Sequence, residues 1–385
     1  MNVPKLRFKE FNDEYKYRNL SDISTLIKDG THGTHENYEN GIPLLSAKDI
    51  NNNKINIPKD CRKISVDDYN KIYKKYLLKK NDILLTIVGS IGRTALYKNE
   101  KVAFQRSVAT IRIDDNNNSN YIRQYIESPI IINQLNNMTN SSAQGGVYLS
   151  SLSKLNFDIP RKEEQLKVAK FLSLLDKKIE LQSKKIEDLK LFKLYTKNQI
   201  FKDYDEIFKL KDILVKWNKK NKNNSVKYVE SISNKYGFIS QSDQFEDRNV
   251  ASKDLNNYYI IEKGVFGYNP SRLNVGSLAL KTNDKASVVS PLYECFTTSQ
   301  NNQYLLEWFN SKYFRKETIS RFEGGVRNTL NFSNLCEIEI GLPTIEKQNK
   351  YSKIFKIFND KIEFEVKKLY RLQELKKGLM QSMFV

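Results

Sequence analysis

The sequence contains an internal repeat in which pieces of the first half recur in the second half at a nearly constant spacing. Single residues and longer blocks match at the same spacing, and one further block matches at a nearly identical one. The matching pieces are Pro160 and Pro343, Gln165 and Gln348, YIRQYIES (121–128) and YLLEWFNS (304–311), and IGRTAL (91–96) and VGSLAL (275–280). One shift that connects several separate blocks indicates a duplicated unit, because chance similarities would scatter. We therefore expect two similar units in one chain.

A segment with helical periodicity ends each unit. Its hydrophobic residues recur at alternating steps of three and four, which is the spacing of a coiled-coil seam. The seam residues are Leu172, Leu175, Ile179, Ile186 and Leu189 in the first segment, and Phe355, Phe358, Ile362, Leu369 and Leu372 in the second. Polar Gln182 and Glu365 fill the same missing position of the two seams. We expect the two helices to pair antiparallel; the alternative is that each helix packs on its own domain.

The segments before these helices have the pattern of mixed α and β structure. Strand-like apolar runs such as DILLTIVG (82–89) alternate with Asn- and Gly-rich turns. The sequence predicts an α+β fold, with two similar globular domains joined by two long helices that form an antiparallel coiled coil. The expected boundaries are 1–158 for the first domain, 159–205 for a central helical spacer, 206–341 for the second domain and 342–385 for a C-terminal helical spacer.

Charge and cysteine content restrict the class of protein. The 64 Lys and Arg residues outnumber the 45 Asp and Glu residues, which gives a formal net charge of +19. Such a charge favours a polyanionic partner, nucleic acid above all, although a solubilising surface or an A+T-rich genome would also produce it. Three widely separated cysteines argue against a disulfide framework or a cysteine zinc site. No apolar stretch has the length of a signal peptide or membrane span, so we expect a cytoplasmic protein without membrane contact.

The usual catalytic and cofactor motifs are missing from the sequence. It contains no GxxxxGK[ST] phosphate loop and no GxGxxG loop after a strand. The string NPSR (269–272) lacks the second proline and the aromatic residue of an amino-methyltransferase site, so we interpret it as a turn. His32 and His35 have the spacing of a metal pair, but Gly33 between them favours a loop and no third ligand is near, so we expect no metal. The sequence favours a binding protein over an enzyme.

Several motifs in a fixed order, repeated in both units, resemble those of one protein family. They are DGTHGTHENYENGIPLLSAKDI (29–50), KKNDILLTIVGSIGRTAL (79–96) and the helix start at 159–165 in the first unit, and YGFISQSDQF (236–245), VFGYNPSRLNVGSLAL (265–280) and GGVRNTLNFSNLCEIEIGLP (324–343) in the second. Over essentially its whole length, the chain resembles the specificity subunit of Type I restriction–modification enzymes.

This resemblance implies a non-catalytic, sequence-specific reader of double-stranded DNA. Each globular domain would be a target recognition domain that reads one half of a bipartite target, and the helices would set the gap between the halves. Two modification subunits would bind the chain and supply adenine methylation with S-adenosylmethionine. Restriction subunits would supply ATP- and Mg-dependent translocation and cleavage. The resemblance therefore implies no cofactor in this chain itself.

Candidate DNA-contacting residues combine a suitable side chain with a glycine-rich or turn position. Arg, Lys, Asn and Gln discriminate base edges, whereas Thr, Ser and cations also hold phosphates. The candidates are Thr31, His32, Thr34, His35, Lys48, Arg93, Gln105 and Arg106 in the first unit, and Gln241, Ser271, Arg272, Arg327 and Asn328 in the second. For each of them the alternative is an ordinary surface residue whose charge, if it has one, pairs with a carboxylate.

Two other functions are compatible with parts of the sequence. The chain could be an enzyme that combines recognition with methyl transfer or cleavage, but the missing cofactor and catalytic motifs argue against this. It could also be a non-specific DNA-binding scaffold with a coiled coil, whose binding would depend on salt and not on sequence. The two units differ in sequence, and non-specific coating gains nothing from such divergence. Loss of the partner subunits, or modification without cleavage, stays open.

Overall fold

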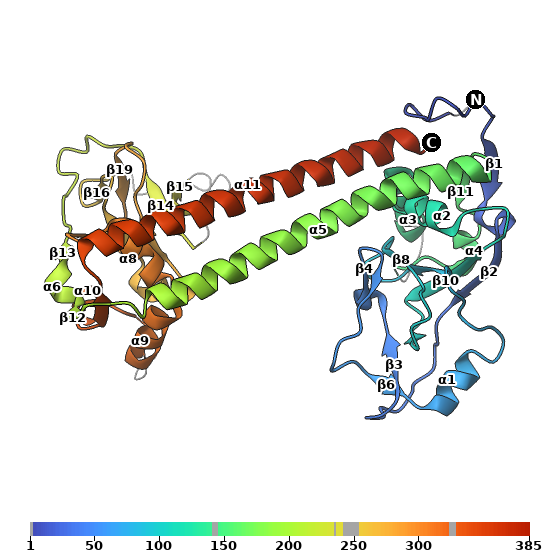
Figure 1. The fold of residues 1–385 in the computed structure, drawn as a ribbon, viewed down its shortest axis with the longest axis horizontal. Coiled ribbons are helices and arrows are strands. Elements are labelled where there is room, and N and C mark those ends of the chain that lie inside the picture. The colour runs from blue at the N-terminus through green and yellow to red at the C-terminus, as the bar shows by residue number, and fades with distance from the viewer. Residues whose placement is uncertain (1–2, 141–144, 235, 242–253, 323–328) are drawn as a thin grey trace. The chain divides into compact units, whose positions relative to one another are not determined.

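The computed structural model of the chain divides into two compact units. Unit 1 contains residues 1–184 and 367–385, and unit 2 contains residues 185–366. Two helices of 39 residues each, α5 (Lys162–Ile200) and α11 (Ile345–Met383), contribute to both units and are drawn in green and red in Figure 1. The structure describes residues 3–140, 145–234, 236–241, 254–322 and 329–385.

A four-stranded antiparallel sheet forms the centre of unit 1. Its strand order is β2 (Ser24–Asp29), β10 (Val108–Ile113), β7 (Ile83–Thr86) and β8 (Thr94–Leu96). All four residues of β7 are buried, because the apolar run ILLT presents alternate side chains to a core on each face of the sheet. Ile83 and Leu85 pack with α2 (Ser119–Ile126), whereas Leu84 packs with β9 on the opposite face.

The remaining elements of unit 1 surround this sheet. They are β1 (Lys16–Asn19), η1 (Leu20–Asp22), β3 (Ile42–Leu45), η2 (Ala47–Asp49), β4 (Ile50–Asn51), β5 (Lys54–Ile55), β6 (Lys63–Ile64), α1 (Val66–Ile72), β9 (Ala103–Phe104), α3 (Pro129–Asn140), α4 (Leu149–Leu152) and β11 (Asn156–Ile159). Strand β1 pairs antiparallel with β11, and β11 leads directly into α5. The beginning and end of the first globular region are therefore joined at the helix start.

Unit 2 is built on a sheet with the same connectivity. Its strand order is β13 (Leu214–Lys216), β20 (Glu294–Thr298), β17 (Phe266–Tyr268) and β18 (Leu278–Leu280). The other elements are β12 (Glu206–Lys209), α6 (Leu210–Ile213), β14 (Glu230–Ser233), β15 (Gly237–Ser240), β16 (Tyr259–Ile261), η3 (Pro270–Val275), β19 (Ser287–Val289), α8 (Asn302–Phe309), α9 (Lys312–Phe322), α10 (Phe332–Cys336) and β21 (Glu339–Leu342). Strand β12 pairs with β21, as β1 pairs with β11.

Equivalent residues of the repeat make equivalent hydrogen bonds in the two units. The Asn118 side chain caps α2 by accepting from the Tyr121 amide, and Asn301 caps α8 by accepting from the Tyr304 amide. Near the start of each long helix, the buried Gln165 donates to the Pro160 carbonyl oxygen at 2.9 Å. Gln348 donates to the Pro343 carbonyl oxygen, also at 2.9 Å. The duplication therefore extends from the sequence to individual side-chain contacts.

Within each unit, the two long helices run in opposite directions. In unit 2, Phe192 packs on Phe358 and Phe201, just past the end of α5, packs on the earlier Phe355. In unit 1, Asp176 of α5 bonds Lys376, while residues nearer the start of α5 share a core with the end of α11. The first part of α5 and the last part of α11 pack in unit 1, and the last part of α5 and the first part of α11 pack in unit 2. In each unit, a helix therefore packs on the domain that precedes it and also runs antiparallel to the other helix.

The predicted helix seam is sheltered from solvent along its length. Leu172, Leu175, Ile186, Phe355 and Leu372 are buried, and Ile179, Leu189, Phe358, Ile362 and Leu369 are half-buried. Gln182 and Glu365 at the polar position are buried as well, and Glu365 bonds Lys185 at 2.7 Å and Lys361 at 3.1 Å. The α+β fold with two similar domains and an antiparallel helix pair is confirmed.

Candidate nucleic-acid interface

In unit 1, the candidate residues gather at one end of the four-stranded sheet. The register pairs Ala109 with Asp29 and Val108 with Thr86, so β2 and β7 end where β8 and β10 begin. The segments 30–35, 87–93 and 105–107 leave the sheet at this end, which we call the loop end of unit 1. Because antiparallel pairing aligns these termini, segments that are far apart in sequence become neighbours.

The segment after β2 is held by its own side chains and by the segment before β10. Thr31 forms a parallel bridge with Gln105, and its hydroxyl oxygen lies 2.8 Å from Nε2 of His35. His35 is largely buried and its Nδ1 lies 3.3 Å from Asp68, whereas His32 is exposed and lies 2.5 Å from Asp29. His35 therefore shapes the loop from inside, and exposed His32 and Thr34 remain accessible.

Gln105, Arg106 and Lys48 lie on neighbouring backbone segments at the same end. The backbone amide of Gln105 donates to the Leu45 carbonyl oxygen at 2.8 Å, and the backbone amide of Ala47 donates to the Ser107 hydroxyl at 3.1 Å. These bonds place η2 and Lys48 beside this segment. A depression of about 360 Å³ is lined by Leu44, Ser46, Lys48, Asp49, Pro58, Asp60, Cys61, Arg62 and Gln105. Sequence reasoning missed Arg62 and Asp60, because KDCRK (59–63) carries no motif that marks it as a binding segment.

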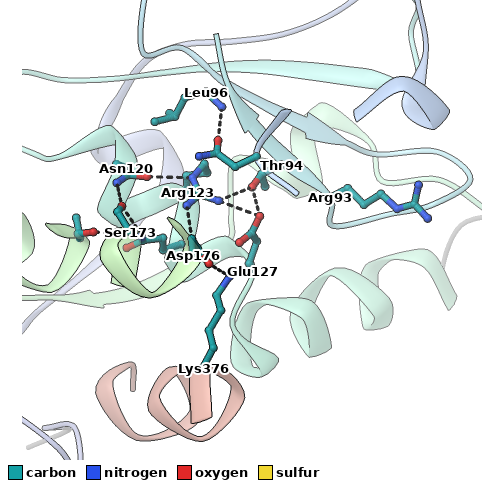
Figure 2. Close-up of polar contacts among 12 residues, drawn as sticks. Arg93, Thr94, Leu96, Asn120, Arg123, Glu127, Ser173, Asp176 and Lys376 are labelled. Atoms are coloured by element: carbon teal, nitrogen blue, oxygen red, sulfur yellow. Dashed lines mark hydrogen bonds and ion pairs between the residues drawn. The ribbon is translucent and has the colours of Figure 1, made fainter. Parts of the chain in front are cut away.

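Arg93 occupies the tight connection between β7 and β8. Gly92 has a φ of +86°, and a Cβ atom there would lie 2.4 Å from Cδ1 of Ile132, so the turn requires glycine. The Arg93 amide donates to the Thr86 hydroxyl at 2.9 Å, which fixes the backbone while the side chain stays exposed. Figure 2 shows the Arg93 side chain pointing away from the neighbouring cluster of polar residues.

The cations at the loop end of unit 1 are available for an external anion. Within the described part of the chain, no ion pair involves the side chains of Lys48, Arg62, Arg93 or Arg106, and three of these four are candidates from the sequence. An exposed guanidinium or ammonium without a carboxylate partner favours phosphate binding or a bidentate contact to a base edge. Among the described residues, Lys48, Arg93 and Arg106 therefore form none of the ion pairs that were the alternative for them, and their contacts with DNA stay predictions.

In unit 2, the corresponding connection between β17 and β18 carries Ser271 and Arg272. Asn269 accepts a hydrogen bond from the Ser271 amide at 3.0 Å, and Pro270 opens the short helix η3, so NPSR forms a turn as predicted. Ser271 and Arg272 are both exposed, and Arg272 forms no ion pair with the residues that the structure describes. They occupy the end of their sheet that matches the position of Arg93 in unit 1.

Gln241 does not join this group. It follows β15, where Ser240 pairs with Glu230, and Glu230 bonds Lys281 immediately after the end of β18. Arg272 instead precedes the start of β18, so the structure places the two candidates near opposite ends of that strand. Arg327 and Asn328 lie outside the described residues.

Neither a metal site nor a membrane span emerges from the described residues. Over that part of the chain, no group of three or more His, Cys, Asp and Glu side chains could hold a metal ion. The helices that the structure describes include none that is long and apolar enough to cross a membrane. His32 and His35 each bond a different carboxylate instead of a common ligand.

Comparison with known proteins matches part of the chain to one family model and the whole chain to a relative of low identity. Residues 12–191 match the Type I restriction modification DNA specificity domain. The putative Type I restriction enzyme MjaX specificity subunit of Methanocaldococcus jannaschii is 22% identical over 98% of this chain and 95% of its own length. The Type I restriction enzyme EcoBI specificity subunit of Escherichia coli is 28% identical over 35% of this chain and 28% of its own length.

Solved structures share the fold at low sequence identity. The crystal structure of a Type I restriction–modification S subunit from M. genitalium has a TM-score of 0.61 and 15% identity, and covers 100% of this chain and 99% of its own. A chain from a Type I restriction–modification structure on complex assembly and conformational transition has a TM-score of 0.55 and 12% identity, and covers 96% of this chain and 97% of its own. The family model thus matches residues 12–191, and the duplicated domains and paired helices of the whole chain are similar to those of solved Type I specificity subunits.

Proposed function

We propose that this chain reads a bipartite double-stranded DNA target, with one half recognised by each unit. The observation that carries this proposal is the pair of equivalent sheet ends, each with an exposed arginine that has no ion-pair partner within the described residues: Arg93 in unit 1 and Arg272 in unit 2. The two arginines lie on equivalent connections of the two equivalent sheets, but the surrounding loops differ in sequence. The two half-sites should therefore differ too.

The side chains at the loop end of unit 1 match the chemistry of base and phosphate recognition. Gln105 offers an amide that pairs with adenine, and Arg93 or Arg106 offers a fork that pairs with guanine in the major groove. Lys48, Arg62 and Thr34 suit phosphate oxygens, which position the protein without reading sequence. A good bidentate contact to a base contributes about 1–3 kcal/mol of discrimination against the wrong base.

The long helices offer two equivalent surfaces to a partner that binds in two copies. Three apolar positions are more than half exposed in both copies of the repeat: Leu174 and Ile357, Leu181 and Phe364, and Phe192 and Leu375. Unit 1 carries one member of each pair and unit 2 carries the other. Exposed apolar side chains at matching positions mark protein-binding surfaces. We assign these surfaces to two copies of a modification subunit.

The chemistry of methylation and cleavage is assigned to partner subunits. The sequence contains no phosphate loop and no glycine-rich cofactor loop, so we assign S-adenosylmethionine to the modification subunits and ATP with Mg to restriction subunits. A related structure is described as the complex assembly of a Type I system, which supports partners of this kind. This chain would contribute target choice alone.

The helix pair is assigned the role of a spacer between the half-sites. Each helix has 39 residues and is therefore about 58 Å long, at 1.5 Å per residue. A seven-residue insertion near Lys184, with a matching insertion in α11, would keep the seam register and add about 10 Å. It should lengthen the unread gap and leave both half-sites unchanged.

A methylome tests the proposed function directly. The chain would be expressed with the methyltransferase encoded beside its gene in a host without adenine methylation, and modified adenines would be mapped. We expect a split motif with two unequal halves that is absent when this chain is omitted. A continuous motif would mean that one unit alone reads DNA. No methylation by a folded and bound partner would favour the non-specific scaffold.

A further inference from the structure

A buried charge cluster lies directly behind the loop end of unit 1. Its centre is Arg123 of α2, whose side chain is 1% exposed. The guanidinium lies 3.0 Å from Glu127 and donates to the Asn120 side chain at 3.0 Å. It also reaches the Thr94 hydroxyl at 3.4 Å, and that hydroxyl donates to Glu127 at 2.6 Å. Figure 2 shows these side chains converging on Arg123.

The cluster joins the recognition segment to both long helices. Thr94 follows the candidate DNA contact Arg93 directly in the chain. On the other side of the cluster, Nη2 of Arg123 lies 3.9 Å from Asp176 of α5, and Asp176 bonds Lys376 of α11 at 2.6 Å. Figure 2 shows Lys376 rising from α11 toward Asp176. One buried arginine thus connects the base of the β7–β8 loop, through a carboxylate, to the helix pair.

A second bond between α2 and α5 runs beside this path. Asn120 donates to the Ser173 hydroxyl at 2.8 Å, and Gln124 donates to the same hydroxyl at 3.1 Å. Gln124 also donates to the Ala169 carbonyl oxygen at 3.3 Å. The face of α2 that meets α5 is therefore polar over about one turn, although Gln124 and Ala169 are both buried there.

Unit 2 has a charge cluster in the same region, with the buried carboxylate of Glu307 at its centre instead of a buried guanidinium. The same repeat spacing that relates Pro160 to Pro343 also relates Gln124 to Glu307, Asp176 to Asn359, and Lys193 to Lys376. Buried Glu307 of α8 accepts from Lys193 and Lys197 of α5, each at 2.9 Å, and Lys193 also donates to Asn359 of α11 at 2.7 Å. In both units, hydrogen bonds and ion pairs join the domain to the long helices; in unit 1 the hydrogen bonds to α5 come from Asn120 and Gln124, and Arg123 adds the ion pair with Asp176 at 3.9 Å.

Stability alone gives no reason for such clusters. Replacing a buried ion pair by well-packed apolar residues is often neutral or stabilising, because desolvation offsets the attraction of the charges. A directional contact instead restricts the position and rotation of the groups that it joins. Arg123 bonds Asn120, and Asn120 bonds Ser173 of α5, so the cluster links the base of a reading loop to the helices and is suited to fixing the orientation of the domain on them.

We propose that Arg123 is a positioning residue, which holds the first recognition domain on the helix pair in the orientation that places its half-site at the correct gap. This inference rests on the proposed function. Arg123 itself is buried and does not reach the surface at which DNA would bind. Its loss should therefore leave the bases that are read unchanged and relax the required gap between the two halves.

The test is Arg123→Met in the full chain, assembled with its modification subunits. Methylation rates would be measured on duplexes with the native gap, with gaps one base pair longer or shorter, and with single-base changes in each half-site. We expect preference for the native gap to fall at least tenfold, and preference for the correct bases to stay within twofold of the unchanged chain.

Arg112→Met is the matched control. Arg112 forms a comparable ion pair in the same unit, 2.8 Å from the buried Asp82, and also bonds the Leu77 carbonyl oxygen; among the described residues, it has no hydrogen bond or ion pair to the long helices. Arg112→Met should leave the gap preference intact. If it relaxes the gap as much as Arg123→Met, general loosening of unit 1 explains the effect and the proposal fails.

A milder variant keeps the test valid if Arg123→Met does not fold. Asp176→Asn creates the residue type that unit 2 already carries at the equivalent position, Asn359, and should relax the gap in the same direction. An unchanged gap preference in a folded Asp176→Asn or Arg123→Met complex would overturn the proposal. If the unchanged chain itself directs no split motif, the proposed function has failed and not this inference alone.

Discussion

The two units use the same positions with different chemistry at the starts of the long helices. In unit 1, Glu164 in the first turn of α5 is buried and bonded by Arg7 at 2.8 Å and by Tyr15 at 3.0 Å. In unit 2, the equivalent residue is Lys347 in the first turn of α11, which donates to Asp205 at 3.0 Å. The contact between helix start and preceding chain is retained while its charges are inverted.

The difference in burial gives the two contacts different strengths. The Glu164 side chain is 2% exposed, and burial, followed by the charge of Glu164, raises the pKa of Tyr15 well above its ordinary value. The Lys347 and Asp205 side chains are 41% and 44% exposed, so water screens their attraction. The same N-terminal segment also contacts α11, because the Leu6 amide donates to the Ser382 carbonyl oxygen at 2.9 Å.

A second difference lies just after the last strand of each central sheet. Tyr97 in unit 1 and Lys281 in unit 2 directly follow the matching blocks IGRTAL and VGSLAL, and both side chains are buried. Tyr97 donates to the Glu100 carbonyl oxygen at 2.6 Å. Lys281 instead bonds Glu230, which also accepts from the Ser287 hydroxyl at 2.5 Å. The two sheets share their architecture, but the buried polar side chain after the last strand has a different partner in each unit.

The largest expected effect comes from breaking this buried pair. Lys281→Met leaves the Glu230 carboxylate buried without its cation and should lower the free energy of unfolding of unit 2 by about 3–5 kcal/mol. Urea unfolding followed by tryptophan fluorescence measures this unit selectively, since both tryptophans of the chain, Trp217 and Trp308, lie in it. Lys216→Met removes the half-exposed ion pair with Glu294 and should cost less than about 1 kcal/mol. If the two variants lower the free energy of unfolding equally, the larger effect expected for the buried ion pair is wrong.

The next effect separates the two reading ends. Arg272→Ala should cost about 1–3 kcal/mol of DNA-binding free energy and relax one half-site alone, if the guanidinium binds a base. Arg93→Ala should do the same for the other half-site. Binding would be measured on duplexes with single-base changes in each half. If both variants weaken all sequences equally, the arginines hold phosphates; if one variant relaxes both halves, the assignment of one half to each unit is wrong.

The helix caps should show that the duplicated contacts are equivalent in energy. Asn118→Ala and Asn301→Ala each remove a side chain that accepts from a backbone amide at 2.9 Å, and each should cost about 1 kcal/mol. Hydrogen exchange of the α2 and α8 amides measures the two losses separately. A difference of more than about 1 kcal/mol between them would show that packing around the two caps has diverged.

The smallest expected effect concerns pH and unit 2. Burial alone would raise the pKa of the Glu307 carboxyl, but the charges of Lys197 and Lys193 outweigh it and hold the pKa below the ordinary value of 4.5. The folded state therefore binds fewer protons than the unfolded state near that pH. The contribution of Glu307 to stability is present above pH 4.5 and is lost as the pH falls through the folded pKa. Glu307→Gln should flatten this acid dependence in tryptophan-monitored unfolding; an unchanged slope would contradict it.

The candidate site shows which positions sequence reasoning finds and which it misses. Arg93 and Arg272 were identified because glycine or a turn motif surrounds them, and both occupy exposed connections at equivalent sheet ends. Arg62 was missed because its segment has no such local signal; it borders the depression through the pairing of its backbone with Leu44. Gln241 was grouped with Arg272, and the hairpin β14–β15 carries it toward the other end of β18. Their roles on DNA stay predictions.

The sequence by itself determined the duplication, the mixed α and β domains and the helix seam, because period and repeat are local properties that a chain carries before it folds. Which side chains meet depended on the tertiary structure. Thr31 lies beside Gln105 and Arg123 faces Asp176 only after strands and helices far apart in sequence have paired. Hydrophobic spacing sets the face that each element buries, whereas long-range registers and buried charges choose the neighbours of individual polar groups.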